Sequence, residues 1–182
     1  MNSTFRSQFA IMLNGLRAID LRTVGQRFVV LTIAAIAVFS VVLSSPAWAE
    51  DYSARDLSGA DLSNQELTDA IFTRATLRSI NLSHSNLQGV SFFGANLDRA
   101  NLEGADLSYA TLDKARITRT NLKNAILEGA YAFNAKFEGS EIEGADFTDM
   151  YMREDEHALL CSMATGTNPV TGRNTYDTLY CD

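Results

Sequence analysis

Two cysteines, Cys161 and Cys181, are the residues of this 182-residue chain whose type and spacing point most clearly to chemistry. They are its only cysteines, and both lie near the C-terminus. In an oxidising compartment such a pair is most simply a disulfide. Closing a loop of about 20 residues would stabilise the fold by roughly 3 kcal/mol in the chain-entropy model.

Other chemistry for the cysteines has less support. A metal site is not favoured, because His84 and His157 are the only histidines and no Cys-x-x-Cys occurs. A reactive redox pair is an alternative, but no motif supports it. The chain has no G-x-S-x-G elbow and no zinc motif, and Gly166 to Gly172 lacks the lysine of a phosphate loop. We therefore predict no enzymatic activity and no cofactor.

The first 49 residues indicate an oxidising compartment. Residues 28–43 are apolar or small without a charge, and the stretch SSPAWA follows and ends at Ala49. Four arginines precede this segment: Arg6, Arg17, Arg22 and Arg27. This order predicts a secretory signal peptide cleaved between Ala49 and Glu50. An uncleaved anchor is the alternative, but sixteen residues are short for a span of about 20. Either Met1 or Met12 could be the start.

The net charge of residues 50–182 indicates which kinds of partner are not expected. Residues 1–49 hold four arginines and one aspartate, so residues 50–182 carry 11 basic and 21 acidic residues, a net charge of −10. Such a surface is a poor match for nucleic acid or anionic lipid. We therefore expect no nucleic-acid partner and no membrane association after cleavage. We interpret Lys114, Arg116, Arg119 and Lys123 as an ordinary solvated mixed face.

An apolar residue at every fifth position dominates the exported part. A helix turns about 100° per residue and a strand alternates with period two, so neither keeps such residues on one side. The chain must therefore turn once within every five residues. The apolar centres are Leu57, Leu62, Leu67, Phe72, Leu77, Leu82, Leu87, Phe92, Leu97, Leu102, Leu107, Leu112, Ile117, Leu122, Leu127, Ala132, Phe137, Ile142, Phe147 and Met152.

The positions around these centres also repeat. Alanine or another small residue usually stands two residues before a centre, and glycine recurs two residues after it, where a corner needs backbone freedom. ADL occurs at 60–62 and 105–107, and ANL at 95–97 and 100–102. This pattern resembles the pentapeptide-repeat family, whose consensus is A-(D/N)-L-x-x.

The resemblance implies a fold and the residue ranges of its parts. Family members form a right-handed quadrilateral β-helix with four pentads to a coil, an all-β solenoid. Twenty pentads would make about five coils. We therefore expect a signal peptide at 1–49, a β-helix at 50–154 and a short α-helical cap with the disulfide at 155–182.

With four pentads to a coil, residues twenty apart stack on one face. Three faces are then polar apart from Ile126. The fourth carries Ile71, Phe93, Tyr131, Phe133 and Tyr151, a candidate partner surface. Two alternatives together are favoured over partner binding: the aromatic side chains stabilise one another between coils, or the C-terminal tail covers them.

The remaining titratable candidates fit this scheme as surface residues. Asp61, Asp106 and Asp146 fall on outward repeat positions, where we expect them to be solvated rather than paired. We place His84 at a corner and His157 in the first turn of a helix.

The C-terminal tail suggests a compartment. A helix is expected within 153–163 and a helical turn within 175–180, with a loop between them. LLCSMATGTNPVTGRNTYDTLYC is similar to the tails of exported family members from cyanobacteria and the chloroplast thylakoid lumen. The resemblance implies a non-catalytic structural or interaction protein of the thylakoid lumen or periplasm, a monomer or weak dimer with an unidentified protein partner. The alternative is an acidic, DNA-mimicking, gyrase-binding protein of the cytoplasm.

Overall fold

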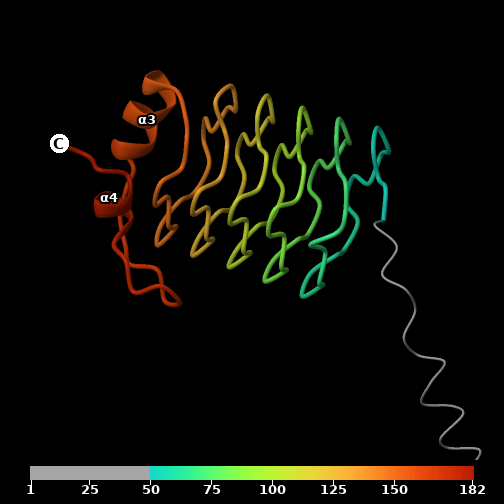
Figure 1. Ribbon diagram of the computed structural model, residues 1–182, viewed down its shortest axis with the longest axis horizontal. Helices are drawn as coiled ribbons and strands as arrows, with labels where there is room; N and C mark the ends of the chain where they lie inside the picture. Colours follow the sequence, from blue (N-terminus) through green and yellow to red (C-terminus); the bar gives the residue numbers. More distant parts are fainter. Residues whose placement is uncertain (1–49) are drawn as a thin grey trace, which may run out of the picture. The chain divides into compact units, whose positions relative to one another are not determined.

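A solenoid with a coil of 20 residues forms most of the structure, a computed structural model that describes residues 50–182. The predicted signal peptide at 1–49 lies outside the described residues. One residue of each pentad forms a parallel bridge with the residue twenty positions on, from Asp51 with Ile71 to Tyr131 with Tyr151. Four pentads therefore make one coil, and successive coils stack directly on one another (Figure 1).

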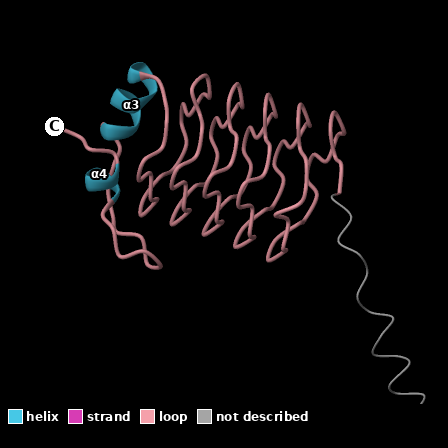
Figure 2. Cartoon of the chain, viewed as in Figure 1, coloured by secondary structure: helices cyan, strands magenta, loops and turns pink. Residues whose placement is uncertain are grey.

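The coils contain no continuous strand within residues 50–182, which corrects the simple all-β expectation. Each parallel contact is an isolated bridge, and Figure 2 draws the coils as loops and turns. The physical reason is the period of five: a corner interrupts the backbone before two neighbouring residues can pair in succession.

Hydrogen bonds within and between coils fix the corners. The Ala75 N–H donates to the Phe72 carbonyl at 3.0 Å, which closes a turn, and the Phe72 N–H donates to the Ser91 carbonyl of the next coil at 2.9 Å. At most corners the residue two positions after a centre has a positive φ, such as Gly94 at 66°. Non-glycine residues also adopt it, His84 among them at φ 57°, so His84 lies at a corner as expected.

The predicted centres line the axis of the solenoid. Those from Leu67 to Phe147 are buried, together with the alanines that precede them. Leu57 and Leu62, in the first coil, are only partly buried. Aromatic rings of successive coils stack inside the core. The ring centroids of Phe72 and Phe92 are 5.1 Å apart, and the two rings are nearly parallel.

Two short helices close the C-terminal end. Helix α3 spans Glu154–Cys161 and helix α4 spans Thr175–Thr178 (Figure 1). The N–H groups of the last coil have no further coil to which they could donate, so side chains of the cap accept hydrogen bonds from them. The Phe137 N–H donates to the Glu156 carboxylate at 3.1 Å, and the Phe147 N–H to the Thr178 hydroxyl at 3.1 Å.

Candidate functional site

The candidate interaction surface is the aromatic face, made of Ile71, Phe93, Tyr131, Phe133 and Tyr151. Four of its side chains are exposed, with fractions of 37% for Ile71, 45% for Tyr131, 37% for Phe133 and 55% for Tyr151. The parallel bridges that link Ile71 to Ser91, Thr111, Tyr131 and Tyr151 in turn place these residues on one side of the solenoid.

Three of these residues form a compact ring cluster. The ring centroid of Tyr151 lies 5.2 Å from that of Tyr131 and 5.5 Å from that of Phe133, and both pairs are stacked. Phe93 lies apart from the cluster, half-buried, with the Lys114 ammonium 5.1 Å from its ring centroid. Stacking between coils therefore occurs, but it leaves the rings accessible.

The C-terminal tail does not bury the aromatic face, so that alternative is wrong. The tail packs on the end of the last coil instead, because the unpaired N–H groups that it can satisfy are there. An open cleft of about 580 Å³ separates Phe133 from the start of helix α3. Its lining includes Met152, Glu154 and Asp155.

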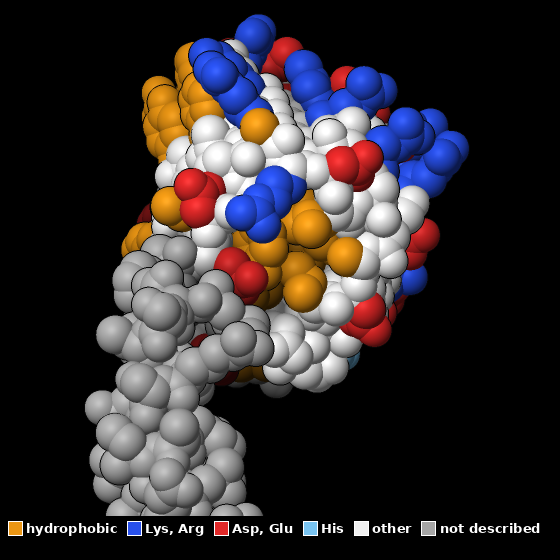
Figure 3. All heavy atoms as spheres, turned by 90° about the vertical axis from the view of Figure 1, so that its right-hand side faces the viewer, with side chains coloured by type: hydrophobic (Ala, Val, Ile, Leu, Met, Phe, Trp, Pro, Cys, Tyr) orange, Lys and Arg blue, Asp and Glu red, His pale blue; other side chains and the backbone are white. Residues whose placement is uncertain are grey.

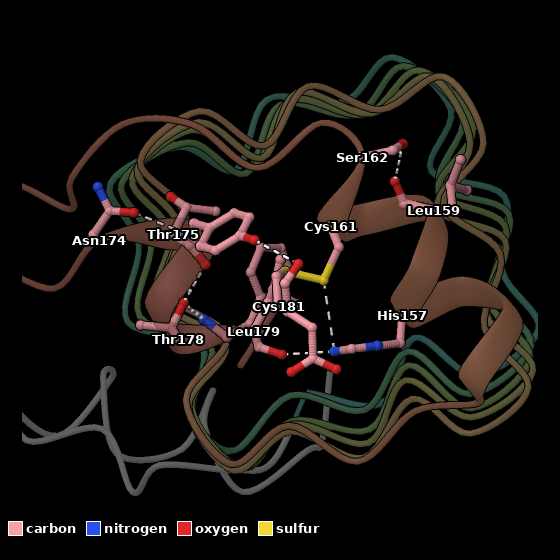
Figure 4. Close-up of a disulfide and its surroundings, with 12 residues drawn as sticks. His157, Leu159, Cys161, Ser162, Asn174, Thr175, Thr178, Leu179 and Cys181 are labelled. Atoms are coloured by element: carbon pink, nitrogen blue, oxygen red, sulfur yellow. Dashed lines mark hydrogen bonds between the residues drawn. A yellow bond between two sulfur atoms is a disulfide. The ribbon is translucent and has the colours of Figure 1, made fainter.

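The cap contains the expected disulfide. Cys161 and Cys181 are joined with their Cα atoms 5.7 Å apart. His157 is not the simple surface residue expected from the sequence: it is half-buried, and its Nε2 lies 2.6 Å from the Leu179 carbonyl and 3.6 Å from Cys161 Sγ (Figure 4). His157, Cys161 and Cys181 bring their nitrogen and sulfur atoms within 4.8 Å of one another, a spacing that a metal site would need. The disulfide, however, occupies both sulfur atoms, so no thiolate is available as a ligand.

Asn168 is a structural residue that the sequence analysis missed. Its side chain is completely buried and donates to the carbonyls of Asn124, Ala125 and Gly144 at 3.1, 3.3 and 2.9 Å. Its Oδ1 accepts from the Val170 N–H at 2.9 Å. One side chain thus joins the cap loop to the last two coils. The only sequence signal was an Asn-Pro dipeptide, which indicates a turn and nothing about burial.

Asp146 is paired rather than solvated, which corrects the prediction for this carboxylate. It is fully buried, and Arg173 Nε donates to it at 2.7 Å while a second guanidinium nitrogen of Arg173 donates to Glu128. Burial would raise the pKa of Asp146, but hydrogen bonds from Thr148, Thr171 and Arg173 hold it below its ordinary value. The repeat pattern could not predict this, because Arg173 comes from the cap.

A second buried carboxylate, Asp98, lies on the opposite face of the solenoid, two pentads from the face of Asp146. Arg119 Nε donates to it at 2.9 Å, Thr118 Oγ1 at 2.8 Å, and an Arg78 nitrogen lies 3.4 Å away. Hydrogen bonds from Arg119 and Thr118 lower the pKa of Asp98 to about 2. It is therefore ionised at any physiological pH and serves to hold basic side chains in place.

The helices of the described part give no sign of a membrane span, since neither α3 nor α4 has the length and hydropathy that one requires.

Comparison with known proteins places these features in a family. The sequence profile described as "Pentapeptide repeats (8 copies)" matches residues 53–84, 85–124 and 112–149. A crystal structure of a pentapeptide repeat protein from the Arabidopsis thaliana thylakoid lumen is 46% identical, with a TM-score of 0.70. The match covers 71% of this chain and 90% of that one. That neighbour and the family profile together indicate a right-handed quadrilateral β-helix.

Two further matches are more limited. The "Thylakoid lumenal 15 kDa protein 1, chloroplastic" of Arabidopsis thaliana is 50% identical over 38 residues, which are 21% of this chain and 17% of that protein. The chain thus matches about a sixth of this relative's length. HetL, a pentapeptide repeat protein involved in heterocyst differentiation regulation in the cyanobacterium Nostoc, is 25% identical over 56% of this chain and 57% of its own, with a TM-score of 0.41.

Proposed function

The chain belongs to the pentapeptide-repeat family, and from this premise we propose that it is a non-catalytic protein of the thylakoid lumen that binds another protein through its aromatic face. The observation that carries the proposal is the exposed cluster of Tyr131, Phe133 and Tyr151. Rigid aromatic side chains supply large contact area at a low cost in conformational entropy, and tyrosine is enriched where binding energy concentrates.

A binding role fits the architecture better than catalysis does. The axis of the solenoid is filled by its own leucine, phenylalanine and alanine side chains. The most perturbed carboxylate, Asp98, is fully engaged by Arg119 and Thr118 and supports structure. A function is therefore expected at the outer surface, where the aromatic face differs most from the polar outward positions of the other faces.

The lumenal location is supported by two relatives from that compartment and by the disulfide in the cap. Intact-mass spectrometry of the protein purified from fractionated source cells, with and without reductant, tests it. We expect a chain beginning at Glu50 in the lumenal fraction that gains two hydrogens on reduction. A full-length, reduced, cytosolic chain would contradict export and would favour the gyrase-binding alternative instead.

The binding role is tested by photo-crosslinking in the source cells. The photoreactive residue benzoylphenylalanine replaces Phe133 in one variant and Thr68, an exposed residue of a polar face, in the matched control. We expect a discrete crosslinked band from position 133 and none from position 68. Equal labelling at both positions would contradict a specific site.

Serine substitutions then separate binding from packing. With the photoreactive residue kept at position 133, we expect the Tyr131→Ser, Tyr151→Ser double variant to lose the crosslinked partner with little change in melting temperature. A collapse of the melting temperature would mean that the rings stabilise the solenoid rather than bind a partner.

A further inference from the structure

The basic side chains of this acidic protein gather on one side of the solenoid. Residues 50–182 contain eleven lysines and arginines. Eight of them lie on one polar face, at the corners along its two edges or, for Arg55, two residues before the first centre of that face. We call this set the basic face: Arg55, Arg74, Arg78, Arg99, Lys114, Arg116, Arg119 and Lys136. All eight are exposed, and in Figure 3 the Lys and Arg side chains lie mostly along the upper edge.

The charge separation is large. The same face and its corners also hold three acidic residues, Asp56, Asp98 and Glu138. This side of the solenoid therefore carries a net charge of +5, and the rest of residues 50–182 carries a net charge of −15. The sequence analysis interpreted part of this set as a mixed face. It missed the gathering because several members come from different coils, such as Arg99, which lies twenty residues before Arg119.

Part of the basic face is already neutralised and part is not. Arg78 and Arg119 pair with Asp98, and Lys136 pairs with Glu156. Among the described residues, no carboxylate pairs with Arg74, Arg99, Lys114 or Arg116. An open groove of about 690 Å³ runs here, with Lys114, Arg116, Arg119 and Lys136 in its lining.

The chain itself shows what kind of group this surface accepts. Helix α3 places Glu154, Asp155 and Glu156 in its first turn, at the C-terminal end of the basic face. Lys136 Nζ lies 2.5 Å from the Glu156 carboxylate and 3.9 Å from that of Asp155. An acidic segment of this chain therefore already packs against Lys136, the last cation of the basic face.

We propose that the basic face, from Arg74 to Arg116, binds an acidic segment of a partner protein. The inference deepens the proposed function and rests on it, because it identifies the chemistry of the partner that the neighbouring aromatic face contacts. The two surfaces meet where Lys114 lies over the Phe93 ring. The stacked coils hold these cations at fixed positions over several successive coils, so together they can contact several carboxylates of one extended acidic chain.

Other anions fit this surface less well. A flat anionic membrane would bring lipid head groups close to the exposed Glu154 and Asp155, as well as to the strongly acidic flanks. A small oxyanion needs several donors that converge in a shielded site, whereas the unpaired cations here are exposed and distributed over several coils.

The test measures binding of a fluorescent peptide of twenty glutamates to the full chain by anisotropy. The neutralised variant is Arg99→Gln, Lys114→Gln, Arg116→Gln, which leaves the ion pairs of Asp98 and Glu156 in place. The control variant, Gln65→Glu, Thr68→Glu, Lys123→Gln, changes the net charge by the same amount on the other faces. A glutamine peptide of the same length, inorganic phosphate and phosphatidylglycerol vesicles are the comparison ligands.

We expect the glutamate peptide to bind the natural chain and the control variant alike, and the neutralised variant at least about tenfold more weakly. Equal binding by all three chains would overturn the proposal. Displacement of the peptide by phosphate beyond the effect of ionic strength, or tighter binding to the vesicles, would overturn it in favour of those anions. The Tyr131→Ser, Tyr151→Ser variant keeps every cation, so loss of crosslinking from position 133 there with unchanged peptide binding separates the two proposals.

Discussion

The ring of Tyr109 covers Gly129 of the next coil so closely that a Cβ at position 129 would lie 2.6 Å from Tyr109 Cε1. Both residues occupy corners with positive φ, 60° and 64°. His84 covers Gly104 in the same way. Glycine at these corners therefore has two causes, the backbone conformation and the side chain stacked on it from the preceding coil.

Replacing Gly129 by alanine should consequently destabilise the protein more than replacing Gly89. Gly89 also has a positive φ, but a Cβ there would meet nothing within 4 Å. We expect Gly89→Ala to lower the free energy of unfolding by about 1 kcal/mol from backbone strain, and Gly129→Ala by roughly 1 kcal/mol more, because the exposed Tyr109 ring must leave its stacked position. Urea unfolding of both variants measures the difference.

The double variant Tyr109→Ala, Gly129→Ala provides the control. Removing the ring should bring the cost of the added Cβ at 129 down to that at 89. Equal losses for Gly89→Ala and Gly129→Ala in the natural background would contradict the role of the stacked ring.

The ion-paired Asp98 should make stability depend on pH in the acid range. Hydrogen bonds from Arg119 and Thr118 lower its pKa from 3.8 to about 2 in the folded protein. The folded state thus favours the ionised form, and this contribution is complete above pH 4 and is lost as the pH falls from about 4 to about 2. The stability gap between the natural chain and Asp98→Asn should therefore be wide at pH 6 and narrow toward pH 2.

Urea unfolding across this pH range measures the gap. The control is Glu138→Gln on the same flank, an exposed carboxylate that forms no ion pair among residues 50–182. A gap for Asp98→Asn that stays constant with pH would mean that the substitution acts through shape rather than charge.

The sequence predicts the coils, the two cap helices and the disulfide, but not the contacts that attach the cap to the last coils, for a physical reason. A strict period of five determines which side chains, such as Leu97, reach the axis and which, such as Arg99, form corners. Interactions between coils are harder to see, because Asp98 and Arg119 are 21 positions apart and their pairing depends on the coil length. Contacts such as Arg173 with Asp146 follow no repeat, so no periodicity could predict them.

Asn168 should be among the most sensitive polar positions in the cap. Its amide N–H groups are shared among three backbone carbonyls, and each net hydrogen bond is worth about 1 kcal/mol, so we expect Asn168→Ala to lower the free energy of unfolding by about 2–3 kcal/mol. Asn168→Asp should cost at least as much, because a carboxylate has no N–H to donate and faces the carbonyl oxygens. Thermal unfolding measures both variants. Val170→Ala, in the same loop but 76% exposed, is the control; an equal loss there would contradict a specific role for Asn168.

The disulfide and His157 should be partly redundant links that hold the cap together. Both connect helix α3 to the chain end after α4: Cys161 through Cys181, and His157 through the Leu179 carbonyl at 2.6 Å. Reduction removes the covalent link, and we expect it to lower stability by about 3 kcal/mol for a loop of this length. In the reduced protein the His157 hydrogen bond becomes one of few remaining links, so His157→Ala should lower the melting temperature more with reductant than without.

The Cys161→Ser, Cys181→Ser variant should reproduce the reduced state and be insensitive to reductant. Strictly additive effects of His157→Ala and reduction would show that the two links act on separate parts of the cap.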